Sequence, residues 1–225
     1  VKDLVKHGVI VVGLARRVRA VQDLAEELKG ERGTLHAIKV DVKVEKEIVD
    51  AFAWIEENTP GVDILINNAG VAHVDNLIDG SADKWKEMFE VNVLGLSICA
   101  REAIKSMKKK NIDDGIIVNI NSIAGRRIFN LLSMYSASKF AVAVLSEALY
   151  KEVKTSGLPI RVTNISPGMV GTEMLTDWVE KLNFPVDYND VLQPADIANA
   201  VNFVLATGSN VHIPELTIMP SKQDA

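Results

Sequence analysis

The sequence predicts a single α/β domain built around a doubly wound, mainly parallel sheet. Short apolar runs rich in Val and Ile alternate with longer amphipathic segments along the 225 residues. The segments between the runs are long enough for right-handed strand–helix–strand crossovers. With 48% hydrophobic and 24% charged residues, the composition fits one globular domain over residues 1–225.

The expected strands are short and largely apolar, as in a parallel sheet whose two faces are covered by helices. Asp41 closes the second strand, and Pro167 stops the fifth because proline cannot donate to the ladder. The strands are expected at residues 9–14, 35–40, 63–66, 115–121, 160–165 and 215–219.

The expected helices show apolar residues at helical spacing and end at glycine or proline. Gly30 ends the first, Pro60 and Gly61 end the second, and Gly157 lies near the end of the long helix that carries Tyr135. The other helical segments are 20–29, 44–58, 82–92, 94–109 and 194–206.

Notable residues follow each of the first five strands. Because ligands bind at the carboxyl ends of the strands in such sheets, we expect these residues to converge on one binding rim. They are Arg16 and Arg17 after the first strand, Asp41 and Val42 after the second, Asn68, Ala69 and Gly70 after the third, Ser122 after the fourth, and Pro167 and Gly168 after the fifth.

Tyr135 and Lys139 lie four residues apart on an expected helix, so their side chains share one face. A neighbouring ammonium favours the phenolate, and we expect Lys139 to lower the pKa of Tyr135 toward the range of acid–base catalysis. By itself this spacing is more typical of a solvated surface pair. The small residues Ser136, Ala137 and Ser138 favour the catalytic interpretation, because they let another surface approach closely.

Taken together, these motifs resemble those of the short-chain dehydrogenases/reductases, in the same order along the chain. They are Asn67-Asn68-Ala69-Gly70, Asn92, Ser122, Tyr135 with Lys139, and Pro167-Gly168 with Thr172. The resemblance covers nearly the whole chain. Within that family the sequence is most similar to the dehydrogenase/reductase member 11 group and the insect farnesol dehydrogenases.

The resemblance implies a Rossmann-like fold in which Tyr135 is the acid–base residue and Ser122 holds the substrate oxygen. Lys139 would grip the nicotinamide ribose, and Asn92 would anchor a water that relays the proton. From the residues alone, Ser122 fits a strand-end cap equally well, and Asn92 fits a helix break that satisfies its own backbone. The implied cofactor contacts are Arg16, Arg17, Asp41, Val42, Asn68, Ala69, Gly70, Tyr135, Lys139, Pro167, Gly168, Val170 and Thr172, and no metal site is expected.

Arg16 and Arg17 favour NADP(H) as the cofactor. Both arginines follow the strand expected at residues 9–14. In dinucleotide-binding folds, an acidic side chain at this position accepts a hydrogen bond from the adenosine 2′-hydroxyl, whereas arginine accommodates a 2′-phosphate. The first carboxylate after the strand is Asp23, and a guanidinium binds phosphate through two parallel hydrogen bonds. The alternative interpretation is a surface arginine pair.

The chain departs from the family pattern at its start. No Gly-x-x-x-Gly-x-Gly turn precedes the first expected strand, and residues 1–8 resemble the end of a helix. We therefore expect an N-terminally truncated domain that lacks the first strand and the glycine-rich turn. By the family's strand order, the missing strand would lie between residues 9–14 and 64–66.

The segment 173–192 bears on the substrate. Its apolar side chains would line a pocket if the segment closes over the site, or would pack a small helix on the sheet, and the sequence does not choose between the two. A pocket would suit an apolar alcohol or ketone, such as the isoprenoid farnesol or a steroid. These side chains are Met174, Leu175, Trp178, Val179, Leu182 and Phe184.

Charge and cysteine content limit the partners and the compartment. A net charge of −5 argues against a nucleic-acid partner, and no apolar stretch is long enough for a transmembrane helix. The single cysteine, Cys99, cannot form an internal disulfide and is expected to be a buried thiol in the reducing cytoplasm. Phe140 and Val144 make the Tyr135 helix apolar on a second face, which predicts a homodimer or homotetramer.

Two functions follow from these observations. The first is an NADP(H)-dependent oxidoreductase acting on an apolar alcohol or its carbonyl, and the presence of Asn92, Ser122, Tyr135 and Lys139 favours it. The second is a catalytically impaired, truncated product that serves as a binding or oligomerising module, and the missing glycine turn favours that alternative.

Overall fold

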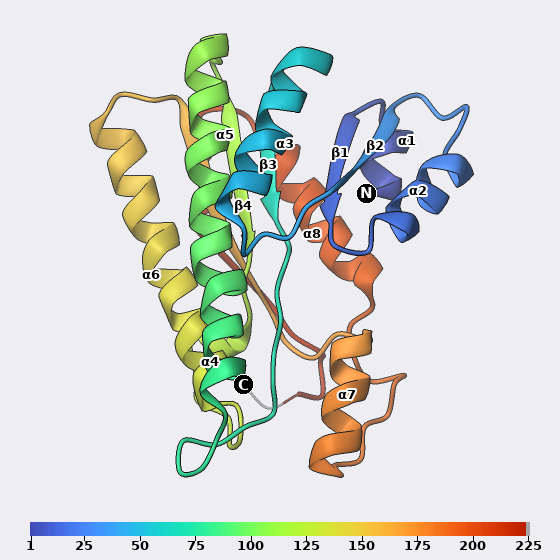
Figure 1. Cartoon of the computed structure of the whole chain (residues 1–225), viewed down its shortest axis with the longest axis vertical. Coiled ribbons are helices and arrows are strands. Elements are labelled where there is room, and N and C mark those ends of the chain that lie inside the picture. Colours follow the sequence, from blue (N-terminus) through green and yellow to red (C-terminus); the bar gives the residue numbers. More distant parts are fainter. Residues whose placement is uncertain (224–225) are drawn as a thin grey trace.

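The computed structural model describes residues 1–223 and has the expected architecture of parallel strands flanked by helices (Figure 1). The strands form two sheets, with the orders β1–β2 and β3–β4–β5–β6. Their bounds are β1 Ile10–Ala15, β2 Thr34–Lys39, β3 Ile64–Asn67, β4 Gly115–Ile120, β5 Ile160–Pro167 and β6 Glu215–Ile218. All neighbouring strands are parallel, which confirms the predicted fold class.

Helices cover both faces of the larger sheet. Alternate residues of β4 show this directly: Ile117 packs into the core beneath α3 and α5, whereas Ile116 and Val118 pack against α8. The helices are α1 Lys2–Lys6, α2 Val18–Glu27, α3 Glu45–Asn58, α4 Ala82–Phe89, α5 Leu96–Lys110, α6 Ser133–Thr155, α7 Glu173–Leu182 and α8 Pro194–Leu205.

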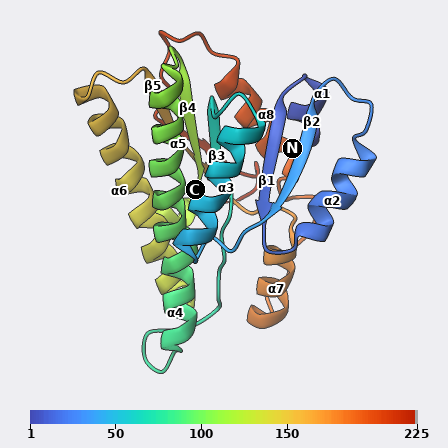
Figure 2. The ribbon, with the colours of Figure 1, turned by 45° about the horizontal axis from the view of Figure 1, so that its top comes forward.

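Strands β1 and β3 belong to different sheets, and this is where the sequence predicts an interruption (Figure 2). Ile10 at the start of β1 is 48% exposed. The two sheets nevertheless share a core, because α3 contributes Phe52 to a cluster that includes Val12 of β1 and Ile117 of β4. Packing against helices, and not a continuous ladder of hydrogen bonds, therefore connects the halves.

The two helices expected at 82–92 and 94–109 form one continuous rod. A π-helical turn, Glu90–Gly95, joins α4 to α5 without a break. A β-carbon on Gly95 would lie 2.7 Å from the carbonyl oxygen of Val42, so the rod approaches the turn after β2 as closely as backbone allows. The widened turn thus places Asn92 in the interior.

The start of the chain and its single cysteine are as the sequence predicts. Residues 1–8, which were expected to end a helix, contain the short helix α1, and after it Gly8 adopts a φ of +89° that favours glycine. Cys99 is buried, and burial raises the pKa of its thiol to about 11, as suits a structural thiol. Across residues 1–223, no helix is both long and apolar enough to cross a membrane.

Candidate active site

Strand β4 and helix α6 bring Ser122, Tyr135 and Lys139 together. Ser122 follows the last residues of β4 and starts a short 3₁₀ turn, where its Oγ accepts a hydrogen bond of 3.1 Å from the backbone N–H of Ala124. The Ser122 hydroxyl also faces the phenol of Tyr135, where it favours the phenolate and so lowers the pKa of that group. Ser122 is therefore both a cap and a partner of Tyr135.

Tyr135 and Lys139 are buried, so the interpretation as a solvated surface pair is wrong. The two residues are 4% and 6% exposed, and the Lys139 ammonium lies 5.9 Å from the centre of the Tyr135 ring. Lys139 Nζ donates to the carbonyl oxygen of Ile120 at 3.0 Å, which ties α6 to the end of β4. The pair thus faces the carboxyl end of the sheet.

The expected lowering of the Tyr135 pKa is wrong for this structure. Burial raises the pKa of Tyr135 to about 12, and the neighbouring Ser122 hydroxyl opposes that effect only in part. Burial also lowers the pKa of Lys139 to about 8. Removing both groups from water disfavours both charged forms, and this outweighs the attraction on which the expectation rested.

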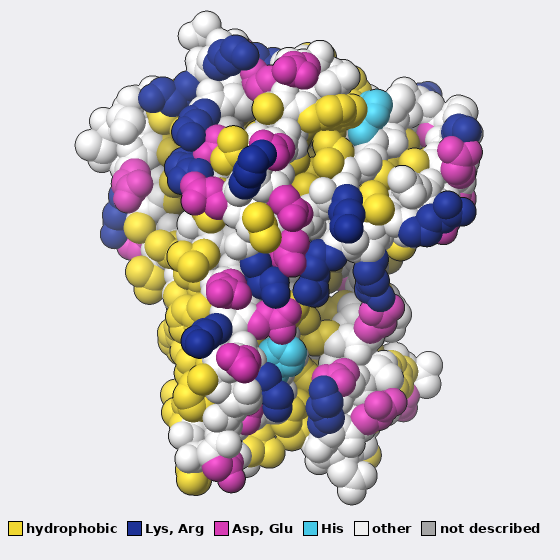
Figure 3. All heavy atoms as spheres, in the orientation of Figure 1, with side chains coloured by type: hydrophobic (Ala, Val, Ile, Leu, Met, Phe, Trp, Pro, Cys, Tyr) yellow, Lys and Arg dark blue, Asp and Glu magenta, His cyan; other side chains and the backbone are white. Residues whose placement is uncertain are grey.

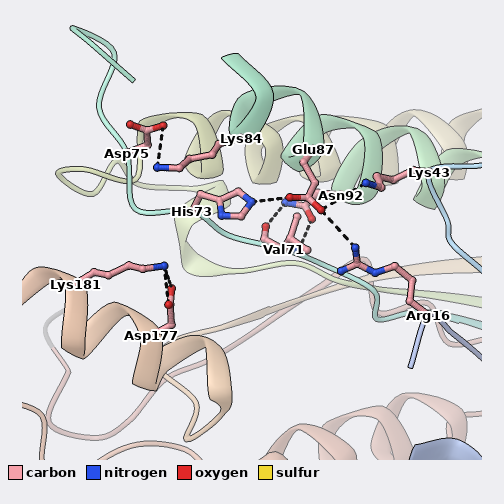
Figure 4. A network of polar contacts seen from close by, with 10 residues as sticks. All are labelled: Arg16, Lys43, Val71, His73, Asp75, Lys84, Glu87, Asn92, Asp177 and Lys181. Atoms are coloured by element: carbon pink, nitrogen blue, oxygen red, sulfur yellow. Dashed lines mark hydrogen bonds and ion pairs between the residues drawn. The ribbon is translucent and has the colours of Figure 1, made fainter. Parts of the chain in front are cut away.

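Asn92 holds the segment after β3 against the helices. Its side chain accepts from the Val71 backbone N–H at 2.8 Å and donates to the Val71 carbonyl at 2.8 Å (Figure 4). It also donates to Ser138 Oγ at 3.0 Å. Its amide therefore serves a neighbouring segment, and the alternative in which it satisfies its own backbone is wrong. Its role in a proton relay remains a prediction.

The residues that follow β3 leave space beside the Lys139 side chain. Asn68 and Ala69 are exposed, and a β-carbon on Gly70 would lie 3.5 Å from Asn92 Oδ1 and 3.8 Å from Lys139 Nζ. The absence of a side chain at Gly70 keeps open the space in front of a buried ammonium. A donor in such a space fits a vicinal diol, as in the ribose of a nicotinamide cofactor.

The first two strand ends carry a charged cluster. Arg16 pairs with Glu87 of α4 at 3.4 Å, and Arg17 pairs with Glu173 of α7 at 3.0 Å. Asp41 accepts from the backbone N–H of Lys43 at 3.0 Å, which shapes the turn that also holds Val42. Both predicted phosphate-binding arginines thus lie on the rim with carboxylates as their partners.

The fifth strand end leads into α7. The backbone N–H of Gly168 donates to Ile218 at 2.7 Å, and a β-carbon there would meet Gln223 Oε1 at 2.3 Å. Val170 bridges to Leu192, and Thr172 precedes the first turn of α7. Pro167, Gly168, Val170 and Thr172 therefore connect the sheet to the helix that faces Tyr135.

An apolar wall surrounds Tyr135. Trp178 of α7 stands edge-on to the Tyr135 ring, with 5.4 Å between ring centres and an angle of 72°. The segment 173–192 thus contributes the small helix α7, and Trp178 of that helix contacts the Tyr135 ring. The lining of a substrate pocket by this segment remains a prediction. The cluster around Tyr135 contains Met88, Ala124 and Leu132, with Val71, Ala72, Val74, Trp85, Phe129, Met134 and Trp178 packed against it.

Several residues of this rim were not predicted from the sequence. Lys43 and Glu87 form ion pairs at the strand ends, and His73 contacts the Glu87 carboxylate. Trp85 and Met88 belong to the apolar wall. The three-residue spacing of Trp85 and Met88 signalled one helix face, but the sequence does not show which surface that face meets. No local signal marked Glu87 as a partner of Arg16.

Comparisons with known proteins place the chain in a family. The family model described as short chain dehydrogenase matches residues 1–183. The human protein named dehydrogenase/reductase SDR family member 11 is 44% identical over 230 aligned positions, covering 99% of this chain and 88% of the relative. The farnesol dehydrogenase of Aedes aegypti is 40% identical, covering 97% of this chain and 88% of the relative.

Solved structures show the same fold. The serine dehydrogenase of Escherichia coli is 28% identical with a TM-score of 0.84, covering 100% of this chain and 92% of its own. A closed form of serine dehydrogenase complexed with NADP+ is 29% identical with a TM-score of 0.87, covering 100% and 90%. From the family match over residues 1–183 and the identity to the curated relatives, the chain belongs to the short-chain dehydrogenases.

Proposed function

We propose that this protein is an NADP(H)-dependent oxidoreductase that interconverts an apolar alcohol and its carbonyl. The observation that carries the proposal is the convergence of Ser122, Tyr135 and Lys139 at the carboxyl end of β4, with Tyr135 and Lys139 buried. A buried phenol with a serine partner and a nearby ammonium suits proton exchange with a substrate oxygen.

The protonation states at neutral pH support carbonyl reduction as one direction. With a pKa raised to about 12, Tyr135 keeps its proton and can donate it to an oxygen that gains negative charge. Lys139, with a pKa lowered to about 8, is mostly charged at pH 7 and stabilises the phenolate that remains. Ser122 would hold the substrate oxygen beside the phenol.

The residues of the rim would hold the cofactor, which when bound supplies or accepts the hydride. Lys139 would bind the ribose hydroxyls in the space beside Gly70, and Arg16 and Arg17 would bind the 2′-phosphate. The remaining predicted contacts are Asp41, Val42, Asn68, Ala69, Pro167, Gly168, Val170 and Thr172. One of the structural neighbours, the closed form of serine dehydrogenase, is complexed with NADP+, which supports this choice of cofactor.

The wall around Tyr135 favours an apolar substrate. Trp178, Trp85 and Phe129 present aromatic surface near the phenol, and such surface binds an aliphatic chain or a ring system by burying apolar area. The farnesol dehydrogenase of Aedes aegypti is one of the relatives, so an isoprenoid alcohol such as farnesol is our first choice and a steroid our second.

Cofactor-coupled oxidation of farnesol and of a steroid alcohol, followed at saturating NADP+ and NAD+, tests the proposal. We expect turnover with NADP+ on an apolar alcohol. Replacing Arg16 and Arg17 with Ala should remove phosphate contacts of about 1.5–3 kcal/mol each, so that NADPH binding weakens far more than NADH binding. Equal losses for both cofactors would contradict the assignment of the arginines.

A further inference from the structure

Glu87 of α4 lies at the centre of a charged cluster on the rim that proton transfer does not use (Figure 4). Its Oε1 atom lies 3.4 Å from an Arg16 guanidinium nitrogen and 3.6 Å from Lys43 Nζ. Its Oε2 atom lies 2.9 Å from His73 Nε2. Arg16 follows β1, Lys43 follows β2 and His73 lies beyond β3, so three strand ends meet at one carboxylate.

The two cations are held loosely. Both approach the same oxygen at distances longer than the roughly 2.7–2.9 Å of a good charge-assisted hydrogen bond. The Arg16 side chain is 53% exposed and that of Lys43 is 29% exposed, so water also reaches them. A group with three acceptor oxygens could satisfy both cations better than the single shared oxygen of Glu87.

His73 gives Glu87 a second, firmer partner. The hydrogen bond from His73 is the main cause that holds the pKa of Glu87 below its ordinary value; partial burial opposes it, and Lys43 and Arg16 add to it. The carboxylate is therefore anionic at neutral pH. It would keep its contact with His73 if Arg16 and Lys43 turned to another anion.

We propose that Glu87 is an internal competitor for an anion site formed by Arg16 and Lys43, and that a ribose 2′-phosphate displaces it. Lys43 becomes a further reader of that phosphate, beyond the two arginines. This inference rests on the proposed use of NADP(H). NAD(H) has a free 2′-hydroxyl and no phosphate to place at this site. Glu87 therefore affects the preference for NADP(H) over NAD(H), and it does not affect the binding of the parts that the two nucleotides share.

Two nucleotides that differ only in the 2′-phosphate test the inference: adenosine 2′,5′-bisphosphate and adenosine 5′-monophosphate. Each is titrated calorimetrically into the full chain and its variants, with thermal melts as a folding check. Glu87→Gln should strengthen bisphosphate binding by about threefold to fivefold, as for the loss of one partly screened charge contact, and leave the monophosphate within about twofold. Lys43→Met should weaken the bisphosphate by about tenfold and spare the monophosphate.

Lys46, an exposed lysine of α3 that pairs with Asp50, provides the matched control, and Lys46→Met should change neither affinity. The inference is overturned if Glu87→Gln leaves bisphosphate binding unchanged or weaker, if Lys43→Met affects both nucleotides equally, or if the unmodified chain does not prefer the bisphosphate. If Glu87→Gln fails to fold, the ratio of bisphosphate to monophosphate affinity in Lys43→Met tests the anion site instead.

These binding ratios do not depend on turnover, which separates this inference from the proposed activity. A chain that oxidises no alcohol but shows the expected ratios refutes the activity and supports the anion site. A chain that oxidises an alcohol with NADP+ but shows no effect of Glu87→Gln refutes the competitor and leaves the activity standing.

Discussion

Burial acts on the two titrating side chains of the site in opposite directions. It raises the pKa of the Tyr135 phenol to about 12 and lowers that of the Lys139 ammonium to about 8, because each group is better solvated when charged. The four-residue spacing predicted that Tyr135 and Lys139 share one helix face, and the resemblance to the short-chain dehydrogenases/reductases singled out the pair. Their pKa values were not predictable, because the burial depends on side chains such as Trp178 that come from distant elements.

The lowered pKa of Lys139 predicts a pH-dependent stability that Lys139→Met should remove. Between the folded pKa of about 8 and an unfolded pKa of about 10.4, only the unfolded state holds the proton, so raising the pH stabilises the wild-type protein. Relative to Lys139→Met, its free energy of unfolding should rise by about 1.4 kcal/mol per pH unit above pH 8. Below pH 8 the difference should be constant.

Urea unfolding from pH 7 to pH 9.5 measures this trend. Lys151 provides the control, because it lies on the same helix with a side chain that is 69% exposed. The difference between wild type and Lys151→Met should not change with pH. A pH-independent difference for Lys139→Met as well would mean that the ammonium is not desolvated in solution.

At the scale of elements, the continuous rod of α4 and α5 is what most differs from the sequence-based expectation. The pattern around Asn92 and Gly95 predicts a break, and the chain forms a π-helical turn there instead. A wide turn is a common feature of functional sites. The sequence shows that regular periodicity is interrupted, but the close contact between Gly95 and Val42 arises only when the turn after β2 packs on the rod.

Gly95→Ala should therefore destabilise the protein, although alanine is normally the better helix former. The added β-carbon would lie 2.7 Å from the Val42 carbonyl oxygen, and relieving that overlap should cost about 1–3 kcal/mol. The control is Gly171→Ala, where the β-carbon would meet side chains at 3.5 Å or more. Chemical denaturation should leave this control within about 0.5 kcal/mol of wild type, and equal effects of the two substitutions would contradict the contact.

At the scale of the whole molecule, the alternation of strands and helices made the fold class predictable. The division into two sheets could be predicted only from the strand order of the family that the sequence resembles. The sequences of β1 and β3, each taken alone, are those of ordinary buried strands. Glu87 shows a further limit. Its contacts with Arg16 and Lys43 join residues that lie far apart in the sequence, and no local pattern encodes them.

The surface of α6 carries the prediction of self-association. Phe140 is 39% exposed and Val144 is 66% exposed, one turn apart on the same helix. Figure 3 shows hydrophobic side chains gathered along the edge of the molecule where α6 lies in Figure 1. Because such a face is usually covered, we expect it to form the contact between two copies of the chain.

Val144→Asp should convert a homodimer or tetramer into a smaller species, since a carboxylate in an apolar interface remains unpaired. Light scattering coupled to size-exclusion chromatography measures the mass. The control is Ile78→Asp, because Ile78 is 96% exposed and lies on the loop before α4, outside the apolar face of α6. A wild-type protein that is monomeric at micromolar concentration, or a Val144→Asp variant of unchanged mass, would contradict the predicted contact.

The turnover of Tyr135→Phe with NADP+ and an apolar alcohol tests whether Tyr135 exchanges the proton with the substrate. The substitution keeps the ring that packs on Trp178 and removes the hydroxyl that exchanges the proton. We expect turnover to fall by at least about 100-fold, as is typical for loss of a general acid–base, while NADPH binding stays near that of the wild type. Wild-type turnover in Tyr135→Phe would contradict the account, and nucleotide binding without turnover in the unmodified chain would favour a binding module.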